Sequence, residues 1–533
     1  MNLYRQSSVC LIAWLAASAA SLGALPAYDI RDYGARGDGQ TLCTAAIQKA
    51  IDACAAAGGG TVWFPAGTWL SGTLHLRSHV TLWLDAGCTL RGSTDLRDYP
   101  EHEPKVRSYT DQYVCQSLIA GEDLEHVAIR GQGVLDGNGA SFRWKQYRNR
   151  PYVIRLVHCR DVSVEGITLR DSPMWMQHYL ACDRLAIRGI RVSNHVSYNN
   201  DGLDVDGCRD VTISDCRLDS DDDALCLKST LDRPCENVTI TNCILSSHCN
   251  AFKTGTESNG GFQNITLSNC VIQPPRDFGV FYGRKGGLAG IALEIVDGGQ
   301  LDQVSISNVV IDGVGVPLFL RLGNRARPFT PDGPQPGVGT FRNVSISHVT
   351  ARGASTIGCP ITGLPGHCIE NVTLSDIRMR FPGGEAKKLV SKEVPELESK
   401  YPESRMFGEL PAYGLYCRHV RGLKCSGLAL GTEQPDQRHA VVCDDVQDLA
   451  IDSLDAEVHR EAAGALRFRD VQRAVVRGCR VDGGPIACFL RLEGPQSGEI
   501  CLMNNVLGSV RSFVDRAAEV SPSAVTEMTN LLK

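Results

Sequence analysis

The chain consists largely of short stretches in which apolar and polar residues alternate. This alternation has the two-residue period of a β-strand with one buried face, and Asn, Asp and Gly stand where the stretches end. The closest stretches lie 23 to 28 residues apart. They begin at residues 79, 126, 161, 184, 210, 237, 264, 303, 343, 371, 448 and 474.

A repeat of this length cannot bury its apolar face alone, so successive units must stack. Stacked units pair their strands about 4.8 Å apart and enclose a continuous apolar interior. Leucine-rich repeats would show a fixed leucine frame with a helical half, and propeller blades need longer units. The pattern therefore predicts an all-β fold, a right-handed parallel β-helix that forms one domain over residues 28–515.

The ends and one insertion depart from the repeat. Residues 44–58 place Ala, Ile and Cys at helical spacing before a run of glycines. A crossover helix of an α/β sheet would have this pattern too, but no regular strand and helix alternation follows. We therefore expect a capping helix here, because the end of a solenoid exposes its core. Residues 381–411 predict a long loop, and residues 516–533 a C-terminal tail or cap.

The N-terminus has the features of an export signal. Arg5 precedes an apolar run from Val9 to Leu22, and small residues at 17–20 offer a cleavage site. We expect a signal peptide over residues 1–24 and a secreted or periplasmic protein. A membrane anchor is the alternative, although the run is short for a span.

The 22 cysteines do not form an obvious disulfide framework. Cys216, Cys243 and Cys270 lie 27 residues apart, each at the end of a strand-like stretch. One repeat of spacing stacks such residues, which predicts a column of buried thiols. No C-x-x-C pair suggests zinc or thioredoxin-like chemistry. A few bridges among the other cysteines remain open.

The composition is that of an ordinary globular protein. The chain has 533 residues, 43% hydrophobic and 21% charged, with a net charge of −6. This balance argues against disorder and against nucleic-acid binding. We expect a monomer that has no membrane contact after removal of the signal.

The densest acidic cluster lies between residues 198 and 229. Asp201 precedes Asp222 and Asp223 by 21 and 22 residues, about one coil, so the three should lie on adjacent coils. Neighbouring carboxylates repel each other, and at least one pKa should rise. A protonated and an ionised carboxylate are the minimum for cleaving a glycoside. Lys228 follows closely and is a candidate for orienting a carboxylate or a sugar hydroxyl.

Other readings of these acids remain open. Aspartate is common in turns, and we assign Asp204, Asp206, Asp210, Asp215 and Asp219 to turns. The run DDD, entering the apolar strand ALCLK, is harder to explain that way. Calcium binding is a further alternative, but neither DVDG nor DSDDD has the ligand spacing of a known calcium loop. We therefore predict no metal and no cofactor.

Several motifs together resemble one family. They are the segment from Tyr33 to Trp69, DGNGASFRW from Asp136, DSPMWMQH from Asp171, NND at 199–201 and DDALCLKS at 222–229. Across most of its length the chain is similar to the polygalacturonase-like glycoside hydrolases of family 28, in what looks like a divergent branch.

The resemblance implies roles for the aspartates. Asp222 would be the general acid, and Asp201 with Asp223 would position and activate water in an inverting mechanism. In such a mechanism the two carboxyl groups lie about 6.5 to 9.5 Å apart, so that a water molecule fits between base and sugar. Asn199, in the NND motif, would contact substrate.

The chain departs from the family at two motifs. The G-H-G motif falls on HCN at 248–250, which displaces His248 by one position, and a polar turn histidine is the alternative. The R-I-K motif, whose cations hold the substrate carboxylate, falls on residues 292–294, which read ALE. Other cations are candidates for this role and equally for plain surface charges: Lys253, Arg284, Arg321 and Arg325. His178 and Trp175 would line the cleft or pack in the core.

Three functions are compatible with these sequence features. The first is a secreted glycoside hydrolase acting on a pectin-related or other plant-type polysaccharide. The second is a polysaccharide lyase on the same fold, which would need an Arg or Lys base beside a uronate. The third is a non-catalytic carbohydrate-binding solenoid, for which an aromatic strip is expected, whereas only 6% of the residues are aromatic.

Overall fold

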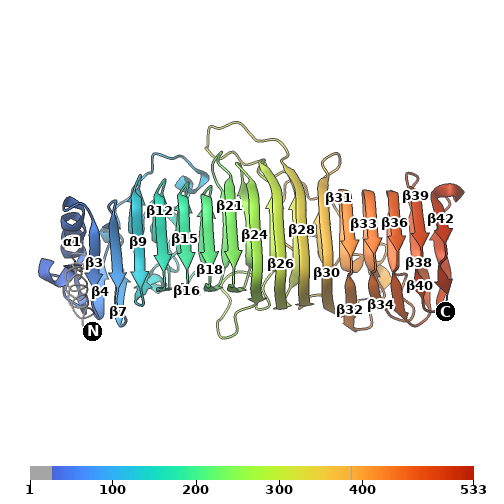
Figure 1. The fold of residues 1–533 in the computed structure, drawn as a ribbon, viewed down its shortest axis with the longest axis horizontal. Coiled ribbons are helices and arrows are strands. Elements are labelled where there is room, and N and C mark those ends of the chain that lie inside the picture. Colours follow the sequence, from blue (N-terminus) through green and yellow to red (C-terminus); the bar gives the residue numbers. More distant parts are fainter. Residues whose placement is uncertain (1–26, 386, 533) are drawn as a thin grey trace, which may run out of the picture.

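A computed structural model describes residues 27–385 and 387–532 of the chain, and the predicted signal peptide lies outside them. The described residues form one elongated stack of coils that runs from the N-terminal to the C-terminal end (Figure 1). Strands of successive coils pair in parallel throughout. The predicted all-β parallel β-helix is confirmed.

Each coil contributes strands to three parallel ladders, which we call A, B and C. Ladder A contains β1 (Ala27–Asp29), β3 (Gly60–Phe64), β6 (Val80–Leu84), β9 (Glu125–Gly131), β12 (Arg160–Glu165), β15 (Asp183–Arg188), β18 (Arg209–Ser214) and β21 (Cys235–Thr241). Ladder B contains β5 (Leu74–His75), β8 (Ser117–Glu122), β11 (Tyr152–Val157), β14 (Gln177–Leu180), β17 (Leu203–Asp206), β20 (Leu225–Ser229), β23 (Asn250–Ser258), β25 (Ala289–Ile295), β27 (Val316–Leu322) and β29 (Cys359–Thr362). Ladder C contains β2 (Asp38–Leu42), β4 (Gly67–Ser71), β7 (Cys88–Gly92), β10 (Val134–Asp136), β13 (Thr168–Arg170), β16 (Arg191–Asn194), β19 (Arg217–Ser220) and β22 (Ile244–Ser247).

Beyond these coils some strands run through two ladders. The strands that pass from A into C are β24 (Phe262–Gln273), β26 (Gln300–Val314), β28 (Thr340–Gly353) and β30 (Ile369–Gly383). The strands that pass from B into A are β31 (Ala412–Ser426) and β33 (His439–Asp452). The remaining strands are β32 (Ala429–Gln434), β34 (Asp455–Val458), β35 (Leu466–Arg469), β36 (Gln472–Arg477), β37 (Arg480–Gly483), β38 (Ile486–Glu493), β39 (Gly498–Met503), β40 (Val506–Leu507), β41 (Val510–Arg516), β42 (Val525–Met528) and β43 (Leu531–Leu532).

The alternating residues of each strand send one side chain into the solenoid and the next outward. In ladder A, Val164, Ile187, Ile213 and Ile240 pair in register on successive coils, and all are buried. Burial of such columns stabilises the stack by about 25 cal/mol for each Å² of apolar surface removed from water. The coil is therefore the unit of stability, and neighbouring coils supply the rest of each other's core.

The predicted thiol column is present. Cys216, Cys243 and Cys270 lie on successive coils and are buried. The 21 cysteines in the described part of the chain are all free thiols, so the bridges that the sequence left open do not form there.

A helix closes the N-terminal end of the stack, and a further coil extends the C-terminal end. Helix α1 (Thr44–Ala56) matches the expected cap, ending two residues early, and it buries Ile47, Ile51 and Cys54. At the other end β42 pairs with β39 and β43 with β40, so most of the expected tail is a further coil. No helix among the described residues is long and apolar enough to cross a membrane.

The long loop starts later than expected. Strand β30 stays paired with β32 as far as Gly383, so the irregular segment runs from 384 to 411 and includes one short 3-10 helix, η6 (Lys387–Leu389). This segment, which we call the 384–411 loop, lies over ladder B: Arg418 of β31 donates hydrogen bonds to the carbonyl oxygens of Val394 and Pro395.

Candidate active site

The three candidate aspartates lie in turns that lead into two neighbouring strands of ladder B. Asp201 precedes β17, and Asp222 and Asp223 precede β20. The backbone N–H of Gly202 donates to the carbonyl oxygen of Asp223 at 2.9 Å, which locks the two turns together. One carboxylate oxygen from each aspartate lies within 4.8 Å of the other two. The coil length thus brings these side chains together, as the spacing predicted.

This separation is shorter than expected. A two-carboxylate inverting site usually holds its carboxyl groups about 6.5 to 9.5 Å apart, whereas the nearest oxygens here lie within 4.8 Å. The reason is local: the aspartates belong to directly stacked turns, and two of them are consecutive residues. The distance alone therefore does not identify an inverting site.

Burial and mutual repulsion keep protons on part of the cluster. Burial, then Asp204 and Asp222, raise the pKa of Asp201 well above its usual value. Burial, then Asp223, raise the pKa of Asp222 to about 7. Burial also raises the pKa of Asp204, a residue first assigned to a turn, to about 8. Near neutral pH the cluster therefore holds protons that it can donate.

Asp223 has a different environment. Its Oδ1 accepts from the backbone N–H and the side-chain amide of Asn250, at 3.2 and 2.7 Å. Its Oδ2 accepts from Lys253 Nζ at 3.0 Å. Three donors, one of them the Lys253 cation, suit a carboxylate that acts as a hydrogen-bond acceptor. Two adjacent residues, Asp222 and Asp223, thus have the different environments that an acid and a base require.

Lys228 lies at the centre of the acidic groups. Its Nζ is 3.6 Å from Asp201, 3.4 Å from Asp204 and 3.8 Å from Glu257. It also lies 4.5 Å from the ring centre of Trp175. None of these contacts is a close hydrogen bond, so the buried ammonium group retains donors for a substrate hydroxyl or carboxylate.

Glu294 stands where the family resemblance places the last residue of the R-I-K motif. Glu294 is fully buried in β25, and its two carboxylate oxygens have no hydrogen-bond partner among the described residues. Burial raises its pKa to about 8, against the opposing effect of Lys253. The cation at this place now comes from β23, as Lys253, and it is used to hold Asp223.

A cavity of about 180 Å³ opens over the cluster. Asp201, Asp222 and Asp223 line it together with Lys228 and Asn199. The other lining residues, which the sequence analysis did not identify as site residues except Trp175, are Tyr113, Tyr147, Met174, Trp175, Glu257, Tyr282, Arg327 and Tyr401. Most of these additional side chains come from loops between strands, where the repeat pattern carries no information.

Glu257 and Arg327 form a buried ion pair in the cavity wall. Arg327 Nη2 donates to Glu257 Oε1 at 2.6 Å, and its Nη1 donates to the Tyr109 hydroxyl at 2.9 Å. Glu257 stands in β23, four residues after Lys253, and its position in the repeat could have identified it as a site residue. Arg327 lies in an irregular segment, and no sequence signal points to it.

Two predicted substrate contacts lie beneath the surface. His178 is buried, its Nε2 lies 3.0 Å from Asp206, and it packs against Trp175. His248 is buried with its Nδ1 2.9 Å from Asp221. Neither lines the cavity, because in both cases a neighbouring aspartate binds the ring. Both histidines therefore support the turns of the site.

The predicted arginines also lie outside the cavity. Arg321 donates to the carbonyl oxygens of Gly363, Glu396 and Leu397 and so anchors the 384–411 loop. Arg325 pairs with Asp297 behind the cavity wall and lies 4.0 Å from Glu257. Arg284 is exposed in the segment between β24 and β25.

Two groups of side chains have the spacing of metal ligands. Besides the three aspartates, the described residues include one such group, formed by His195, Asp221 and His248. Asp221 accepts the backbone N–H groups of Phe281 and Tyr282 at 2.8 and 2.7 Å, so it already secures the segment that carries Tyr282. Among the aspartates, Lys228 and Lys253 supply the positive charge that a metal would bring.

Parts of the chain are similar to known proteins. The chain is 35% identical over 219 residues to a probable polygalacturonase of Vitis vinifera, a match that covers 38% of this chain and 44% of that protein. It is 43% identical over 126 residues to an exo-poly-alpha-D-galacturonosidase of Dickeya chrysanthemi, covering 22% and 20%. The matches thus span less than half of these relatives.

Solved structures share the fold. A hyperthermoactive exopolygalacturonase from Thermotoga maritima superposes with a TM-score of 0.56 at 23% identity, covering 67% of this chain and 87% of that one. The polygalacturonase from Erwinia carotovora gives 0.52 at 21%, covering 64% and 90%. The family model "Glycosyl hydrolases family 28" matches residues 54–397, which include every residue of the aspartate cluster. The chain belongs to glycosyl hydrolases family 28.

Proposed function

We propose that the protein hydrolyses glycosidic bonds in a pectin-related polysaccharide, in the manner of a polygalacturonase. The observation that carries the proposal is the unequal environment of two adjacent carboxyl groups in one cavity. Asp222 has a pKa of about 7, and Asp223 is bound by Lys253 and Asn250. The named relatives include polygalacturonases, which supports the choice of substrate class.

In this mechanism Asp222 donates its proton to the glycosidic oxygen as the bond to the anomeric carbon breaks. Asp223 takes a proton from a water molecule that attacks the anomeric carbon from the opposite face, and Asp201 helps to position that water. One water is consumed, and the products are a saturated reducing end and a free hydroxyl group. We propose inversion at the anomeric carbon, which the family resemblance supports and the carboxyl separation does not.

The shape of the cavity supports action at chain ends. Its volume is about 180 Å³, small for a bound polysaccharide, since ligand sites usually measure about 300 to 1,000 Å³. Tyr113, Tyr147 and Tyr401 come from separate loops and stand around it. A site closed by loops accepts the terminal unit of a chain, so we propose exo-acting hydrolysis.

The experiment is a digest of polygalacturonate and rhamnogalacturonan fragments, with product size measured by chromatography and anomeric configuration by proton NMR. Saturated monomers or dimers of inverted configuration are expected from the first minutes. Retained configuration would overturn the inverting step, and a ladder of internal fragments would overturn exo action. Unsaturated products that absorb ultraviolet light would indicate a lyase. In that case Lys228 or Arg327 would have to act as the base.

We also propose that the protein is exported. The support is the N-terminal pattern of Arg5 and the apolar run to Leu22. Expression of the full chain in a bacterium with an outer membrane, followed by N-terminal sequencing of the periplasmic and medium fractions, tests this. A mature protein starting near residue 25 is expected, and an uncut chain in the membrane fraction would favour an anchor.

A further inference from the structure

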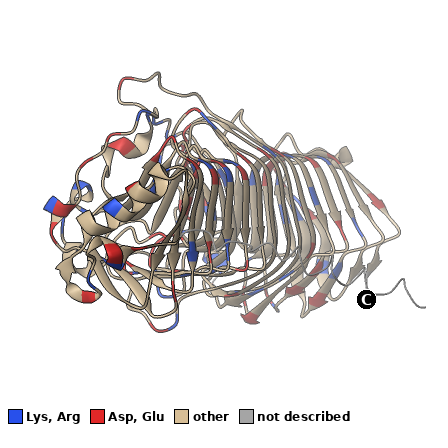
Figure 2. Ribbon diagram, turned by 60° about the vertical axis from the view of Figure 1, so that its left-hand side comes forward, with Lys and Arg blue, Asp and Glu red and all other residues tan. Residues whose placement is uncertain are grey.

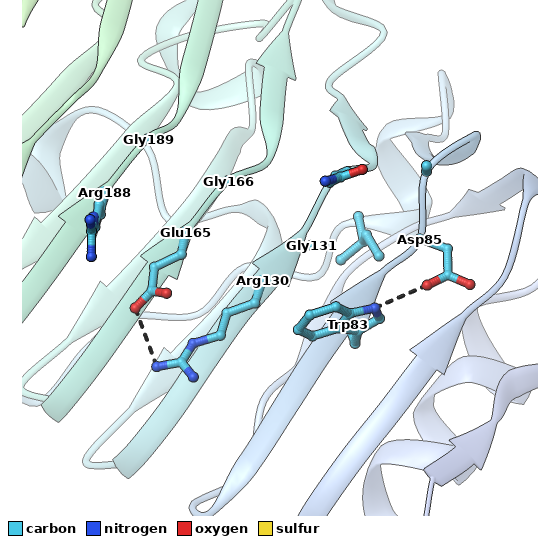
Figure 3. Close-up of a pocket in the computed structure, with 11 residues that line it drawn as sticks. Trp83, Asp85, Arg130, Gly131, Glu165, Gly166, Arg188 and Gly189 are labelled. Carbon is cyan, nitrogen blue, oxygen red and sulfur yellow. Dashed lines mark hydrogen bonds and ion pairs between the residues drawn. The ribbon is translucent and has the colours of Figure 1, made fainter.

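A second concave surface lies on ladder A, away from the cavity on ladder B. It is an open groove of about 840 Å³ at the corner that follows β6, β9, β12 and β15. Figure 3 shows its residues, with Trp83 beside Asp85 at one end and Arg130, Glu165 and Arg188 following across the coils. We call it the corner groove.

The floor of the corner groove is made of glycines. Gly131, Gly166 and Gly189 follow directly after Arg130, Glu165 and Arg188, which pair in register on successive coils. The three glycines have φ angles of 127°, 75° and 64°. The N–H groups of Gly166 and Gly189 donate to the carbonyl oxygens of Arg188 and Ser214 on the next coil, at 3.0 and 2.9 Å. The contribution of the glycines is therefore space, because they place no side chain in the groove.

Backbone geometry does not by itself require all three glycines. A Cβ at Gly131 would lie 2.0 Å from the carbonyl oxygen of Leu84, so packing fixes that residue. A Cβ at Gly189 would meet nothing within 4 Å, and its φ of 64° is one that Asn and Asp also adopt. Gly189 therefore keeps the groove open without a packing reason.

The same corner carries side chains on the following coils. Here φ lies between 52° and 60°, yet no glycine occurs. The residues that continue the column after Gly189 are Asp215, Asn242, Asn269, Asn308, His348 and Asp376. Among the described residues, glycine returns to this column only at Gly427 and Gly478, so six consecutive coils carry a side chain where the coils of the groove have none.

The wall of the groove changes at the same coil. Outward residues paired in register run from Trp83 through Arg130 and Glu165 to Arg188. On the six coils after Arg188 the row consists of small hydroxyl side chains: Ser214, Thr241, Ser268, Ser307, Ser347 and Ser375. The floor column and the wall column thus both change residue type between β15 and β18.

Trp83 provides a rigid aromatic platform. Trp83 is 43% exposed, and its Nε1 donates to Asp85 Oδ1 at 3.0 Å. Asp85 Oδ2 accepts from Nε1 of Trp63, the residue paired with Trp83 on the preceding coil, at 2.7 Å. One carboxylate thus fixes two neighbouring indoles. An exposed, immobilised indole loses little conformational entropy when a flat apolar face stacks on it.

The polar groups of the wall balance in charge. Arg130 lies 3.3 Å from Glu165, and Arg188 lies 3.5 Å from Asp215 with its side chain 73% exposed. Charges of both signs are interspersed along the outside of the coils (Figure 2). The corner groove therefore offers donors and acceptors in alternation, which suits the hydroxyl and carboxyl groups of a chain of sugar rings.

We propose that the corner groove binds a segment of the polysaccharide substrate at a site separate from the active-site cavity. Sugar rings stack their C–H faces on Trp83, and further units lie over the glycines, held by Arg130, Glu165 and Arg188. The groove crosses four strands, about 14 Å at the usual strand spacing, enough for a few sugar units. The identity of the polymer rests on the proposed function. Binding here keeps a long chain near the cavity by effective concentration.

Three variants test the proposal. Trp83→Ala removes the platform, and Gly189→Asn fills the floor at a backbone angle that Asn tolerates. Gly478→Asn is the matched control: Gly478 continues the same corner column with φ 63°, its added Cβ would lie 3.6 Å from the nearest atom, and it is far from the groove. Circular dichroism and thermal unfolding establish that all three fold.

Binding and hydrolysis are measured separately. Affinity for polygalacturonate and for a neutral galactan is measured in the inactive Asp222→Asn background, and kcat/KM is measured in the active background on polymer and on a trimer. Trp83→Ala and Gly189→Asn should lower polymer affinity about tenfold and lower kcat/KM on polymer severalfold, with trimer hydrolysis unchanged. Gly478→Asn should match the unmodified protein.

The outcomes separate this proposal from the proposed function. Polymer binding that is absent, or equal in all variants, overturns the corner groove as a polysaccharide site, even if hydrolysis is normal. Trp83-dependent binding with no hydrolysis of any substrate supports the groove and overturns the hydrolase. A loss for trimer as large as that for polymer overturns the groove too, because it would show an effect transmitted to the cavity.

Discussion

The active-site cavity and the corner groove are built on the same repeat by opposite means. In the cavity, side chains from the turns before β17 and β20 and from β23 converge until Asp201, Asp222 and Asp223 lie within 4.8 Å of one another. In the groove, three successive coils have no side chain at one position, and the wall residues point into solvent. A solenoid can thus make one site by converging side chains from turns and loops, and another by removing side chains in one column of successive coils.

The two regions differ in what they do to stability. The cavity concentrates buried carboxyl groups, which repel one another and lose hydration, and Lys228 and Lys253 offset only part of this effect. The groove buries no charge, so its exposed side chains contribute little to folding in either direction. Substitutions in the cavity should therefore change activity and stability together, whereas those of Gly189 and of the exposed groove side chains should change polymer binding alone.

Asp222→Asn should have the largest effect on activity. Asn has a similar shape but cannot donate the proton, so kcat should fall about 10² to 10⁴-fold, while the midpoint of urea unfolding should rise because a buried charge is removed. Steady-state kinetics on a short pectic fragment and urea unfolding followed by fluorescence check both. The control is Asp219→Asn, a half-exposed residue of the preceding strand. Activity above one tenth of normal in Asp222→Asn would remove it from the role of acid.

Lys253→Met should have the next largest effect. It leaves Asp223 buried without its cation, and loss of one partner from a buried pair costs about 3 to 5 kcal/mol. Both the free energy of unfolding and kcat should fall. In the double variant Lys253→Met, Glu294→Leu, stability should recover in part, because the buried acid beside the lost cation is gone, but activity should not. Recovery of activity in the double variant would mean that Lys253 is not needed to hold Asp223.

The pH dependence should separate the two regions further. The pKa of Asp222 is raised to about 7 from an ordinary value of 3.8. The acid must be protonated, so kcat/KM should fall about tenfold for each pH unit above 7. The raised folded-state pKa means that the folded protein binds more protons than the unfolded chain, so the free energy of unfolding should fall as pH rises from about 4 to 7. Asp222→Asn should flatten that slope, while Trp83→Ala leaves it unchanged. A pH profile of kcat/KM that stays level to pH 9 would contradict the assignment.

Sequence patterns predicted the coils because inward residues must repeat with the strand period wherever stacking buries them. The spacing of Asp201 and Asp222 by one coil length placed them together for the same reason. The pattern could not indicate that β24 or β26 would continue through a corner without a break. The number of strands per coil depends on bends in the backbone, which the alternation of residues does not record.

The rest of the site depends on loops. Arg321 stands in a ladder B strand, where a side chain facing the substrate was a reasonable expectation, but carbonyl groups of the 384–411 loop take its donors. Tyr401 of the same loop lines the cavity, and because it lies outside the repeat, the strand pattern could not predict its place. The sequence did not predict the corner groove, because glycines at strand ends are typical of turns. Only the strand register shows that three of them lie on successive coils at the same position.

The smallest effect should come from Gly189→Asn, measured as stability. The added side chain meets nothing within 4 Å, and Asn tolerates its φ of 64°, so the free energy of unfolding should change by less than about 0.5 kcal/mol. Gly131→Ala provides the contrast: its Cβ would lie 2.0 Å from the carbonyl oxygen of Leu84, so backbone must move and stability should fall clearly. Urea unfolding of the two variants side by side checks this. Equal losses would mean that the glycines serve packing on every coil, and the open floor would then be a by-product of how the corner folds.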